Sequence, residues 1–265
     1  MLTYLSFLAG GVAGAFYYRE RRERVALERL GAASLETLLN AIDANNPETG
    51  AHVRRVAEYA LALAGAADFN ERCRRKVERV ALFHDVGKLD GAVSDIVTES
   101  KLLTAEELRA IRRHPTKGAE VLRPLGAFYP ELPIGVLSHH ERWDGNGYPR
   151  HLRGDSIPVE ARIVSIADTF DAVTQTRSYS HARTLETATR IIADGRGSQF
   201  DPDLVDLFLS PPVLAEVARL LRRAHAPRKA SSKRRRNSAS ASVPDITFRW
   251  RTPTPLLRQQ GRRLP

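Results

Sequence analysis

The 265-residue sequence is long enough for one large domain or two small ones, and its single cysteine, Cys73, excludes an internal disulfide and a thiolate-rich metal cluster within one chain. The formal net charge of +10 belongs to the end of the chain, because residues 226–265 hold eleven of the 41 basic residues and one of the 31 acidic ones. Residues 1–225 are therefore electrically balanced, and the net charge does not make their folded part a nucleic-acid-binding domain.

The chain begins with an uncharged stretch of 17 residues, "LTYLSFLAGGVAGAFYY", followed directly by "RERRER". As a helix it would be about 26 Å long, against a hydrocarbon core of about 30 Å. We expect residues 1–18 to be a transmembrane anchor, and the arginines place the rest of the chain in the cytoplasm. The sequence therefore predicts a single-pass protein of the cytoplasmic membrane. The alternative is a packed or membrane-surface helix, since three glycines weaken the hydrophobicity.

Residues 19–45 follow as a helical stalk, in which leucines recur at spacings of three and four. Such a stalk can pair with a second copy, so a homodimer is one prediction. Residues 46–225 form the globular body, which lacks convincing runs of alternating β-branched residues and is predicted to be all-α. Its expected helices are 52–65, 71–84, 104–112, 116–123, 131–140, 158–173, 184–194 and 202–208.

The composition changes after residue 225 to "APRKASSKRRRNSASASVPD". Serine, proline and clustered arginine cannot build a core, so residues 226–265 are predicted to be a disordered basic tail. The tail is either merely solvated or attached electrostatically to an anionic partner. Anionic lipid is favoured over nucleic acid as that partner because an anchor is expected at the other end of the chain.

Histidines and acids recur within apolar stretches of the body. Glu48 and His52 are four residues apart and would share one helix face. His84 and Asp85 lie in an apolar run that reads as buried helix, where a carboxylate is costly unless it is paired or bound to a metal. Asp168 repeats this pattern, and His114, His139 and His140 complete the set. Imidazole and carboxylate without thiolate suit first-row metals, and these ligands outnumber the four of one zinc ion.

Each of these residues also has a structural interpretation. His114 precedes a proline and would suit a surface or a cap, Glu48 would suit a solvated first turn, and His84 and Asp85 could form a hydrogen-bonded pair. The structural interpretation of the whole set requires five separate coincidences. The sequence therefore predicts a site with more than one metal ion.

These residues and their order resemble the HD-GYP family of metal-dependent phosphodiesterases, within the HD superfamily. The matching strings are "HDVGK", "HPTKGAEVL", "HHERWDGNGYP", "IPVEARIVSIADTFDAVTQTRSY" and "GSQFDP". The resemblance covers roughly residues 45–209. It implies an all-helical domain around two or three divalent metal ions, usually iron or manganese. It also implies bacterial second-messenger signalling, at the inner membrane for an anchored chain, with cyclic di-GMP opened to pGpG and sometimes on to GMP.

Carried over by motif, the resemblance assigns a role to each matching residue. Asp85 would bridge two metals, and Glu48 matches the ligand of a third ion in members that bind three. Lys88 would assist catalysis and, with Arg177, contact the scissile phosphate. Gly147 and Tyr148 lie in the signature loop near the substrate. The implied metal ligands are Glu48, His52, His84, Asp85, His114, His139, His140 and Asp168.

Three departures from the family pattern concern substrate binding. "LDGAVSD" replaces the usual turn after "HDVGK", Ser180 stands where a basic residue is common, and no acid precedes Arg177. Two alternatives therefore stay open beside cyclic di-GMP hydrolysis. One is a non-hydrolytic signalling module that binds cyclic di-GMP or a protein partner. The other is an HD hydrolase of a different phosphoester, for instance another cyclic dinucleotide.

Overall fold

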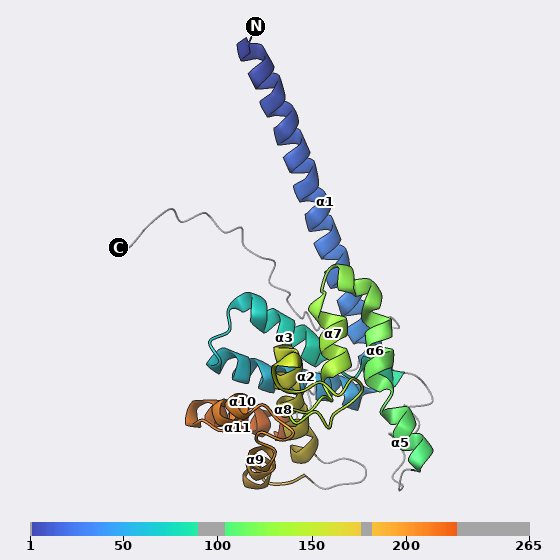
Figure 1. Cartoon of the computed structure of the whole chain (residues 1–265), viewed down its shortest axis with the longest axis vertical. Coiled ribbons are helices and arrows are strands. Elements are labelled where there is room, and N and C mark those ends of the chain that lie inside the picture. The colour runs from blue at the N-terminus through green and yellow to red at the C-terminus, as the bar shows by residue number, and fades with distance from the viewer. Residues whose placement is uncertain (1, 90–103, 176–181, 227–265) are drawn as a thin grey trace, which may run out of the picture. The chain divides into compact units, whose positions relative to one another are not determined.

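A computed structural model describes residues 2–89, 104–175 and 182–226, with the side chains of residues 2–16 and 24 excepted. Within these ranges every named element is a helix, and a lone bridge between Arg196 and Phe200 is the sole strand-like pairing (Figure 1). The prediction of an all-α fold is confirmed.

The helices follow the predicted pattern closely. All eight predicted helices of the body are present, but the sequence did not predict the last one, α11. The elements are α1 (Leu2–Asn45), α2 (Pro47–Ala66), α3 (Glu71–Phe83), η1 (Val86–Leu89), α5 (Ala105–Ile111), α6 (His114–Leu122), η2 (Arg123–Ala127), α7 (Glu131–Ser138), η3 (Gly154–Ser156), α8 (Val159–Thr174), α9 (Leu185–Asp194), α10 (Pro202–Phe208) and α11 (Pro211–His225).

The start of α2 is set by its capping residues. The side chain of Asn46 accepts hydrogen bonds from the backbone amides of Glu48 (2.9 Å) and Thr49 (3.1 Å), and Pro47 occupies the first turn, where its missing N–H costs nothing. This cap fixes the register of α2. As a result His52 lies in the second turn, on the buried side of the helix.

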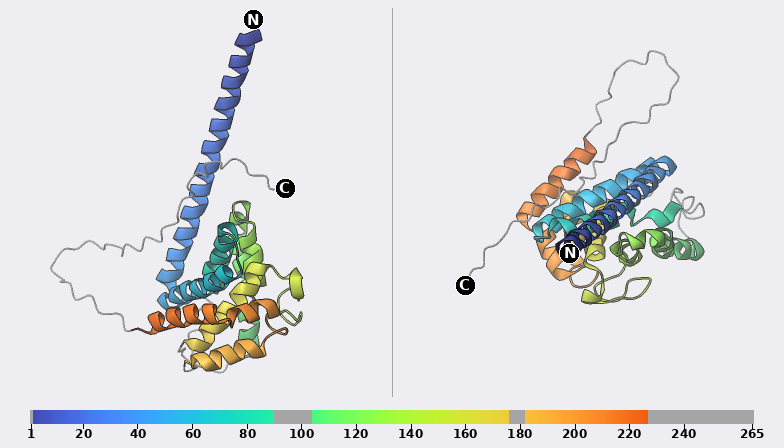
Figure 2. Two further views of the ribbon diagram at one scale, coloured as in Figure 1. Left: turned by 90° about the vertical axis from the view of Figure 1, so that its left-hand side faces the viewer. Right: turned by 90° about the horizontal axis from the view of Figure 1, so that it is seen from above.

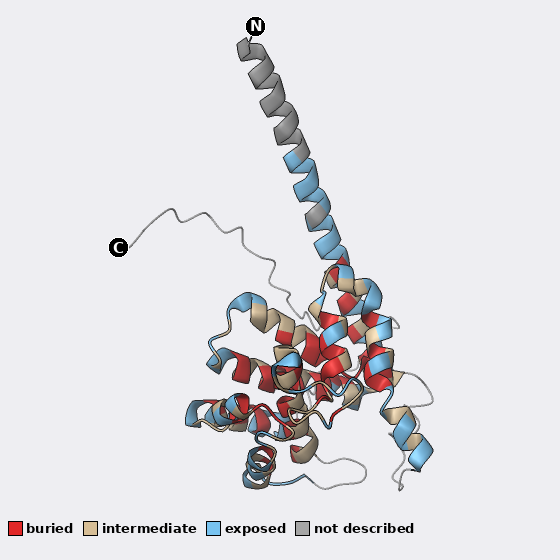
Figure 3. Cartoon of the chain, in the orientation of Figure 1, coloured by how far each residue is buried: buried red, intermediate tan, exposed pale blue. Residues whose placement is uncertain are grey.

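The core forms where α2, α3, α7 and α8 meet, and buried residues concentrate there (Figure 3). The Tyr59 ring of α2 meets the Phe170 ring of α8 edge to face at a centroid distance of 5.0 Å. Phe170 in turn meets Phe208 of α10 at 5.5 Å. These aromatic contacts join three helices that are distant in sequence. They hold α2 and α8 together beside the polar residues that both helices carry.

Helix α1 is uninterrupted across the predicted anchor and stalk (Figure 2). Its last turns pack on the body, because Leu35, Leu39 and Ile42 are buried and α1 contacts α2. Leu27 and Leu30 are exposed instead. The homodimer through this helix stays a prediction.

The prediction of a transmembrane anchor, and with it a single-pass membrane location, is wrong. Among the described helices, none combines the length and the apolar character that crossing a bilayer requires. The physical reason is visible in the sequence of α1. Its uncharged stretch is 17 residues, short of the roughly 20 needed, and contains Gly10, Gly11 and Gly14.

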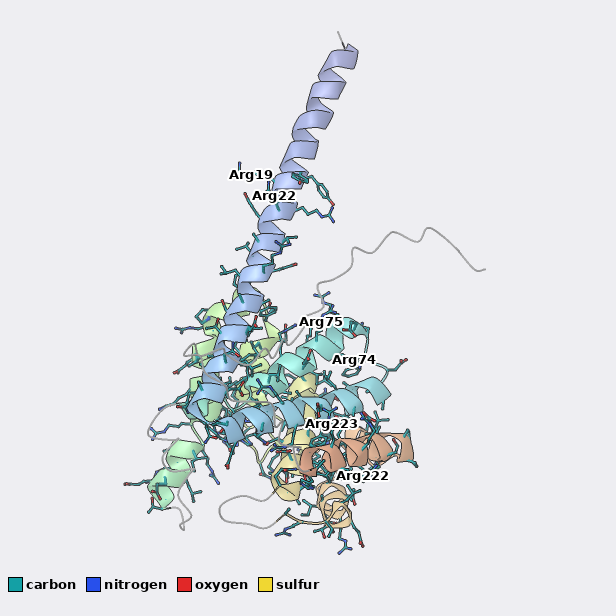
Figure 4. The ribbon with its side chains drawn as sticks, turned by 180° about the vertical axis from the view of Figure 1, so that it is seen from behind. Arg19, Arg22, Arg74, Arg75, Arg222 and Arg223 are labelled. Carbon is teal, nitrogen blue, oxygen red and sulfur yellow. The ribbon has the colours of Figure 1, made fainter. Side chains whose placement is uncertain are left out.

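The described residues belong to a single compact unit that ends at Ala226. Figure 4 marks Arg223 in α11 and Arg19 in α1. Arg223, in the last turn of α11, forms an ion pair with Glu58 of α2, and Arg19 pairs with Glu23 along α1. The predicted basic tail lies outside the described residues. Its disorder and its attachment to lipid stay predictions.

Candidate metal centre

Three of the predicted metal-binding histidines lie at helix ends. His84 directly follows α3, His114 opens α6, and His139 directly follows α7. The Nδ1 of each ring lies within hydrogen-bond distance of a backbone carbonyl three residues earlier, namely that of Ala81 (2.8 Å), Ile111 (2.6 Å) and Val136 (2.6 Å). A carbonyl only accepts, so Nδ1 carries the proton and Nε2 of each neutral ring presents a lone pair. This is the arrangement in which histidine binds a metal.

His52 of α2 reaches the same place from another direction. Its Nδ1 lies 2.7 Å from Oδ2 of Asp171, and its Nε2 lies 3.3 Å from Oδ1 of Asp168 and 3.6 Å from Oδ2 of Asp85. Asp168 and Asp171 both belong to α8, so the pairing of α2 with α8 brings these groups together.

Asp85 lies between the histidines, in the turn between α3 and η1. Its Oδ2 is 3.5 Å from Nε2 of His84, and its Oδ1 is 3.4 Å from Nε2 of His114. Lys88 approaches Oδ2 at 2.7 Å. The sequence led us to expect His84 and Asp85 inside a helix, but α3 ends at Phe83. This early end lets the carboxylate turn toward the histidines.

Among the described residues, two groups of three ligand atoms could each hold a metal ion, and within each group all the atoms lie within 4.8 Å of one another. Group 1 consists of His52, His84 and Asp85, and group 2 consists of His114, His139 and His140. Asp85 of group 1 also faces His114 of group 2. One carboxylate therefore connects both groups.

Several buried atoms in these groups need a cation. The Nε2 atoms of His114 and His139 face each other at 3.1 Å, although the Nδ1 proton of each ring is already donated to a carbonyl. Two facing lone pairs repel each other unless a cation lies between them. In addition, His84 Nε2 and Asp85 Oδ1 are buried without a hydrogen-bond partner among the described residues. The residues present therefore fit divalent metal ions.

The electrostatics favour the ligand forms of these side chains. Burial lowers the pKa of His114 to about 3 and that of His140 to about 4, so both rings are neutral at physiological pH. Burial alone would raise the pKa of Asp85, but Lys88 and His84 outweigh it and hold that pKa well below its usual range. The Asp85 carboxylate thus stays ionised beside the neutral rings of His114 and His140.

These pKa shifts predict a stability maximum for the chelator-treated protein near pH 6.5. His114 and His140 take up protons only in the unfolded chain between pH about 4 and 6.5, so the free energy of unfolding falls as the pH drops through that range. For His52, burial lowers the pKa, but hydrogen bonds with Asp168 and Asp171 outweigh it and raise the pKa to about 10. That contribution is complete below pH 6.5 and is lost as the pH rises toward 10.

Urea unfolding at pH 5, 6.5 and 8.5 measures this profile. Each fully effective group changes the free energy of unfolding by about 1.4 kcal/mol per pH unit. The variant His140→Gln should make the acid side of the profile less steep, because His114 still contributes, and leave the alkaline side unchanged. Equal stability at all three pH values would contradict the assignment.

The signature loop closes over His140. The ring of Tyr148 stacks on His140 with centroids 4.9 Å apart and an interplanar angle of 27°, and the Tyr148 amide donates to the His140 carbonyl at 3.2 Å. Buried Glu141 accepts the amides of Arg150 (2.7 Å) and Leu152 (3.0 Å). These bonds tie both ends of the loop together beside group 2.

The "GSQFDP" segment supports the loop from outside. The amides of Trp143 and Asp144 donate to the carbonyls of Gln199 (3.2 Å) and Ser198 (2.9 Å). The guanidinium of Arg162 lies 5.5 Å from the centre of the Trp143 ring. The two strings are about 50 residues apart in the sequence and form one unit in the fold.

Most of the predicted site residues lie together, with two exceptions. Glu48 is exposed and belongs to neither group, and Arg177 lies outside the described residues.

The sequence did not assign roles to Arg55, Glu141 and Asp171. The spacing of three between Asp168 and Asp171 was the available signal for Asp171. The residues brought together are His52, His84, Asp85, Lys88, His114, His139, His140, Gly147, Tyr148 and Asp168.

Residues 36–204 match the model of the HD domain family. The chain belongs to the HD domain family, in its HD-GYP branch. The family match contains the residues of both metal-capable groups. The predicted family is confirmed.

Curated relatives of this HD domain protein are longer than the chain itself. It is 37% identical over 194 residues to the cyclic di-GMP phosphodiesterase response regulator RpfG of Xanthomonas campestris pv. campestris, covering 72% of this chain and 48% of the relative. It is 39% identical over 177 residues to the 3'3'-cGAMP-specific phosphodiesterase 2 of Vibrio cholerae, covering 65% of this chain and 33% of the relative. The chain therefore spans half or less of these relatives' lengths.

A solved structure shares the fold of this HD domain protein. An HDG"Y"P protein from Bdellovibrio bacteriovorus matches with a TM-score of 0.51 at 20% identity, covering 63% of this chain and 51% of the other. At this identity the likeness concerns the fold alone.

Proposed function

We propose that this protein is a metal-dependent phosphodiesterase that hydrolyses cyclic di-GMP to pGpG. The observation that carries the proposal is the place of Asp85, whose carboxylate connects group 1 with group 2. Two cations held close together can stabilise both the attacking and the leaving oxygen when a phosphodiester is hydrolysed. The names of relatives that are 33–37% identical supply the substrate class.

The residues of the site have distinct tasks in this reaction. Divalent ions, when bound, supply Lewis-acid activation of water and neutralise charge on phosphate oxygens. His52, His84 and Asp85 would hold one ion, and the three histidines of group 2 another. Lys88, half-buried beside Asp85, adds positive charge where the phosphoryl oxygens gain negative charge. Arg177 is proposed as a second phosphate contact.

The identity and number of the ions are further parts of the proposal. Imidazole and carboxylate ligands suit iron and manganese, and the neutral histidines are compatible with both. A third ion would need Glu48, which is exposed at the start of α2, four residues before His52. Its carboxylate would have to turn toward the site.

Another cyclic dinucleotide is the second candidate substrate. The relative that is 39% identical is named as specific for 3'3'-cGAMP. The two molecules differ in one base, so the residues around Tyr148, and not the metal ligands, would discriminate between them. A module that binds without hydrolysis would keep the fold but lack turnover.

One assay separates these candidates. The protein loaded with Mn²⁺ or anaerobically with Fe²⁺ is incubated with cyclic di-GMP or 3'3'-cGAMP, and the products are separated by chromatography. We expect pGpG from cyclic di-GMP, at a higher kcat/KM than the cleavage of 3'3'-cGAMP. Binding without product would support the signalling module, and a preference for 3'3'-cGAMP would reassign the substrate.

A further inference from the structure

His52 differs from the other metal-facing histidines in what holds its ring. His84, His114 and His139 each place Nδ1 against a backbone carbonyl of their own segment. The Nδ1 of His52 instead lies 2.7 Å from Oδ2 of Asp171, a residue 119 positions away on α8. A residue in the middle of a helix has its neighbouring carbonyls engaged in the helix, so His52 needs a partner from another element.

Asp171 is itself held by a third residue. Arg55 of α2 donates from Nε to Oδ1 (2.7 Å) and from Nη2 to Oδ2 (2.9 Å). The Asp171 side chain is fully buried, whereas that of Arg55 is 22% exposed. His52 and Arg55 are three residues apart and grip the same carboxylate from one face of α2. Each hydrogen bond that links His52, Asp171 and Arg55 is charge-assisted, so the orientation of these three side chains is closely defined.

We propose that Arg55 and Asp171 are positioning residues. They hold the His52 ring so that its Nε2 faces the other two members of group 1, His84 and Asp85. This inference deepens the proposed function and rests on it for the presence of a metal ion. A carboxylate at Nδ1 keeps the proton on that nitrogen, so a bound metal ion would displace the proton on Nε2, which lies 3.3 Å from Oδ1 of Asp168. Arg55 prevents the carboxylate from rotating away.

The contacts of Asp171 explain why a carboxylate is needed. Both of its oxygens accept from Arg55, and Oδ2 also faces the Nδ1 proton of His52. In Asp171→Asn, the amide nitrogen would face a donor in either orientation. At the position of Oδ1 it meets Nε of Arg55, and at the position of Oδ2 it meets both partners. The substitution therefore loosens His52 without changing the volume of the side chain.

Zn²⁺ titration of the purified full chain tests the proposal, because binding is measured without catalysis. We expect Asp171→Asn and Arg55→Gln each to weaken Zn²⁺ binding by about 10- to 100-fold. The matched control is Arg54→Gln on the same helix, which breaks a bidentate pair with Asp43 (2.5 Å) that does not touch the site. The control should bind Zn²⁺ as the unchanged protein does.

A double variant distinguishes positioning from general destabilisation. If Arg55 acts through Asp171, then Asp171→Asn with Arg55→Gln loses little more affinity than Asp171→Asn alone. The hydrogen-bonded Nδ1 proton of His52 should also vanish from the NMR spectrum of the Zn²⁺-loaded single variants. If Asp171→Asn fails to fold, the partly exposed Arg55→Gln carries the test.

The result that would overturn the proposal is Zn²⁺ affinity within twofold of the unchanged protein in folded Arg55→Gln or Asp171→Asn. Failure of the proposed function looks different. In that case the unchanged protein binds Zn²⁺ and the variants lose it, but no cyclic dinucleotide is hydrolysed under any metal.

Discussion

We expect the replacement of Asp85 by alanine to remove both metal binding and the proposed hydrolysis in the purified protein. The carboxylate contacts histidines of both groups and the ammonium of Lys88, so its loss takes a ligand from group 1 and the link to group 2. Metal ions supply several kcal/mol of transition-state stabilisation, and each 1.36 kcal/mol is a factor of ten in rate. We therefore expect turnover to fall on the order of 10³-fold or more.

Asp85→Asn and Asp203→Ala complete this experiment. Asp85→Asn keeps the shape but not the charge, and it should lose metal nearly as fully as the alanine variant. Asp203 is an exposed acid in the first turn of α10, and its replacement should leave metal content and turnover unchanged. Metal content by mass spectrometry and the rate of pGpG formation are the two measurements. Wild-type turnover in folded Asp85→Ala would make the assignment of Asp85 wrong.

Gly147→Ala is expected to dislodge the signature loop. A Cβ at this position would lie 2.3 Å from the amide nitrogen of Arg142 and 2.5 Å from Cα of Glu141, closer than real Cβ atoms approach backbone. The loop would have to shift, which breaks the stacking of Tyr148 on His140. We expect the free energy of unfolding to fall by about 2–4 kcal/mol. Turnover should fall by about tenfold or more because Tyr148 leaves its position.

The matched control for this variant is Gly65→Ala. Gly65 lies in the last turns of α2, and a Cβ there meets nothing within 4 Å. Alanine in a helix is more stable than glycine by about 0.5–1 kcal/mol, so this variant should unfold at a slightly higher urea concentration. Thermal or urea unfolding together with steady-state kinetics compares the two. If Gly147→Ala matched Gly65→Ala in both measurements, the close packing of the loop would be disproved.

The parts of the site that the sequence predicts are those in which polar chemistry interrupts an apolar pattern. His84 and Asp85 follow "ALF", and Asp168 follows "IVSIA", so the order of residues is enough to infer a buried polar function. Helix positions were predictable for the same reason, since caps and apolar spacing are local. The start of α2 was missed, however, because the predicted helix 52–65 begins five residues after Pro47, although the Asn46 cap and Pro47 are local signals.

The parts that could not be predicted depend on partners far away in the chain. The contact of Asp171 with His52 spans 119 residues, and the pairing of Trp143 with the "GSQFDP" segment depends on how two loops meet. No spacing rule encodes such contacts. The prediction of a transmembrane anchor was wrong for a different reason. A short, glycine-containing apolar run is barely long enough to span a bilayer, so its length alone did not show whether it is a transmembrane helix.

An X-ray structure of the Mn²⁺-loaded protein, with anomalous scattering, would show directly whether Asp85 joins two metal sites. We expect one manganese peak within group 1 and one within group 2, with Asp85 contributing an oxygen to each. A further peak beside Glu48 would add the third ion predicted from the sequence. A single peak, or peaks away from both groups, would contradict the claim that Asp85 joins two metal sites.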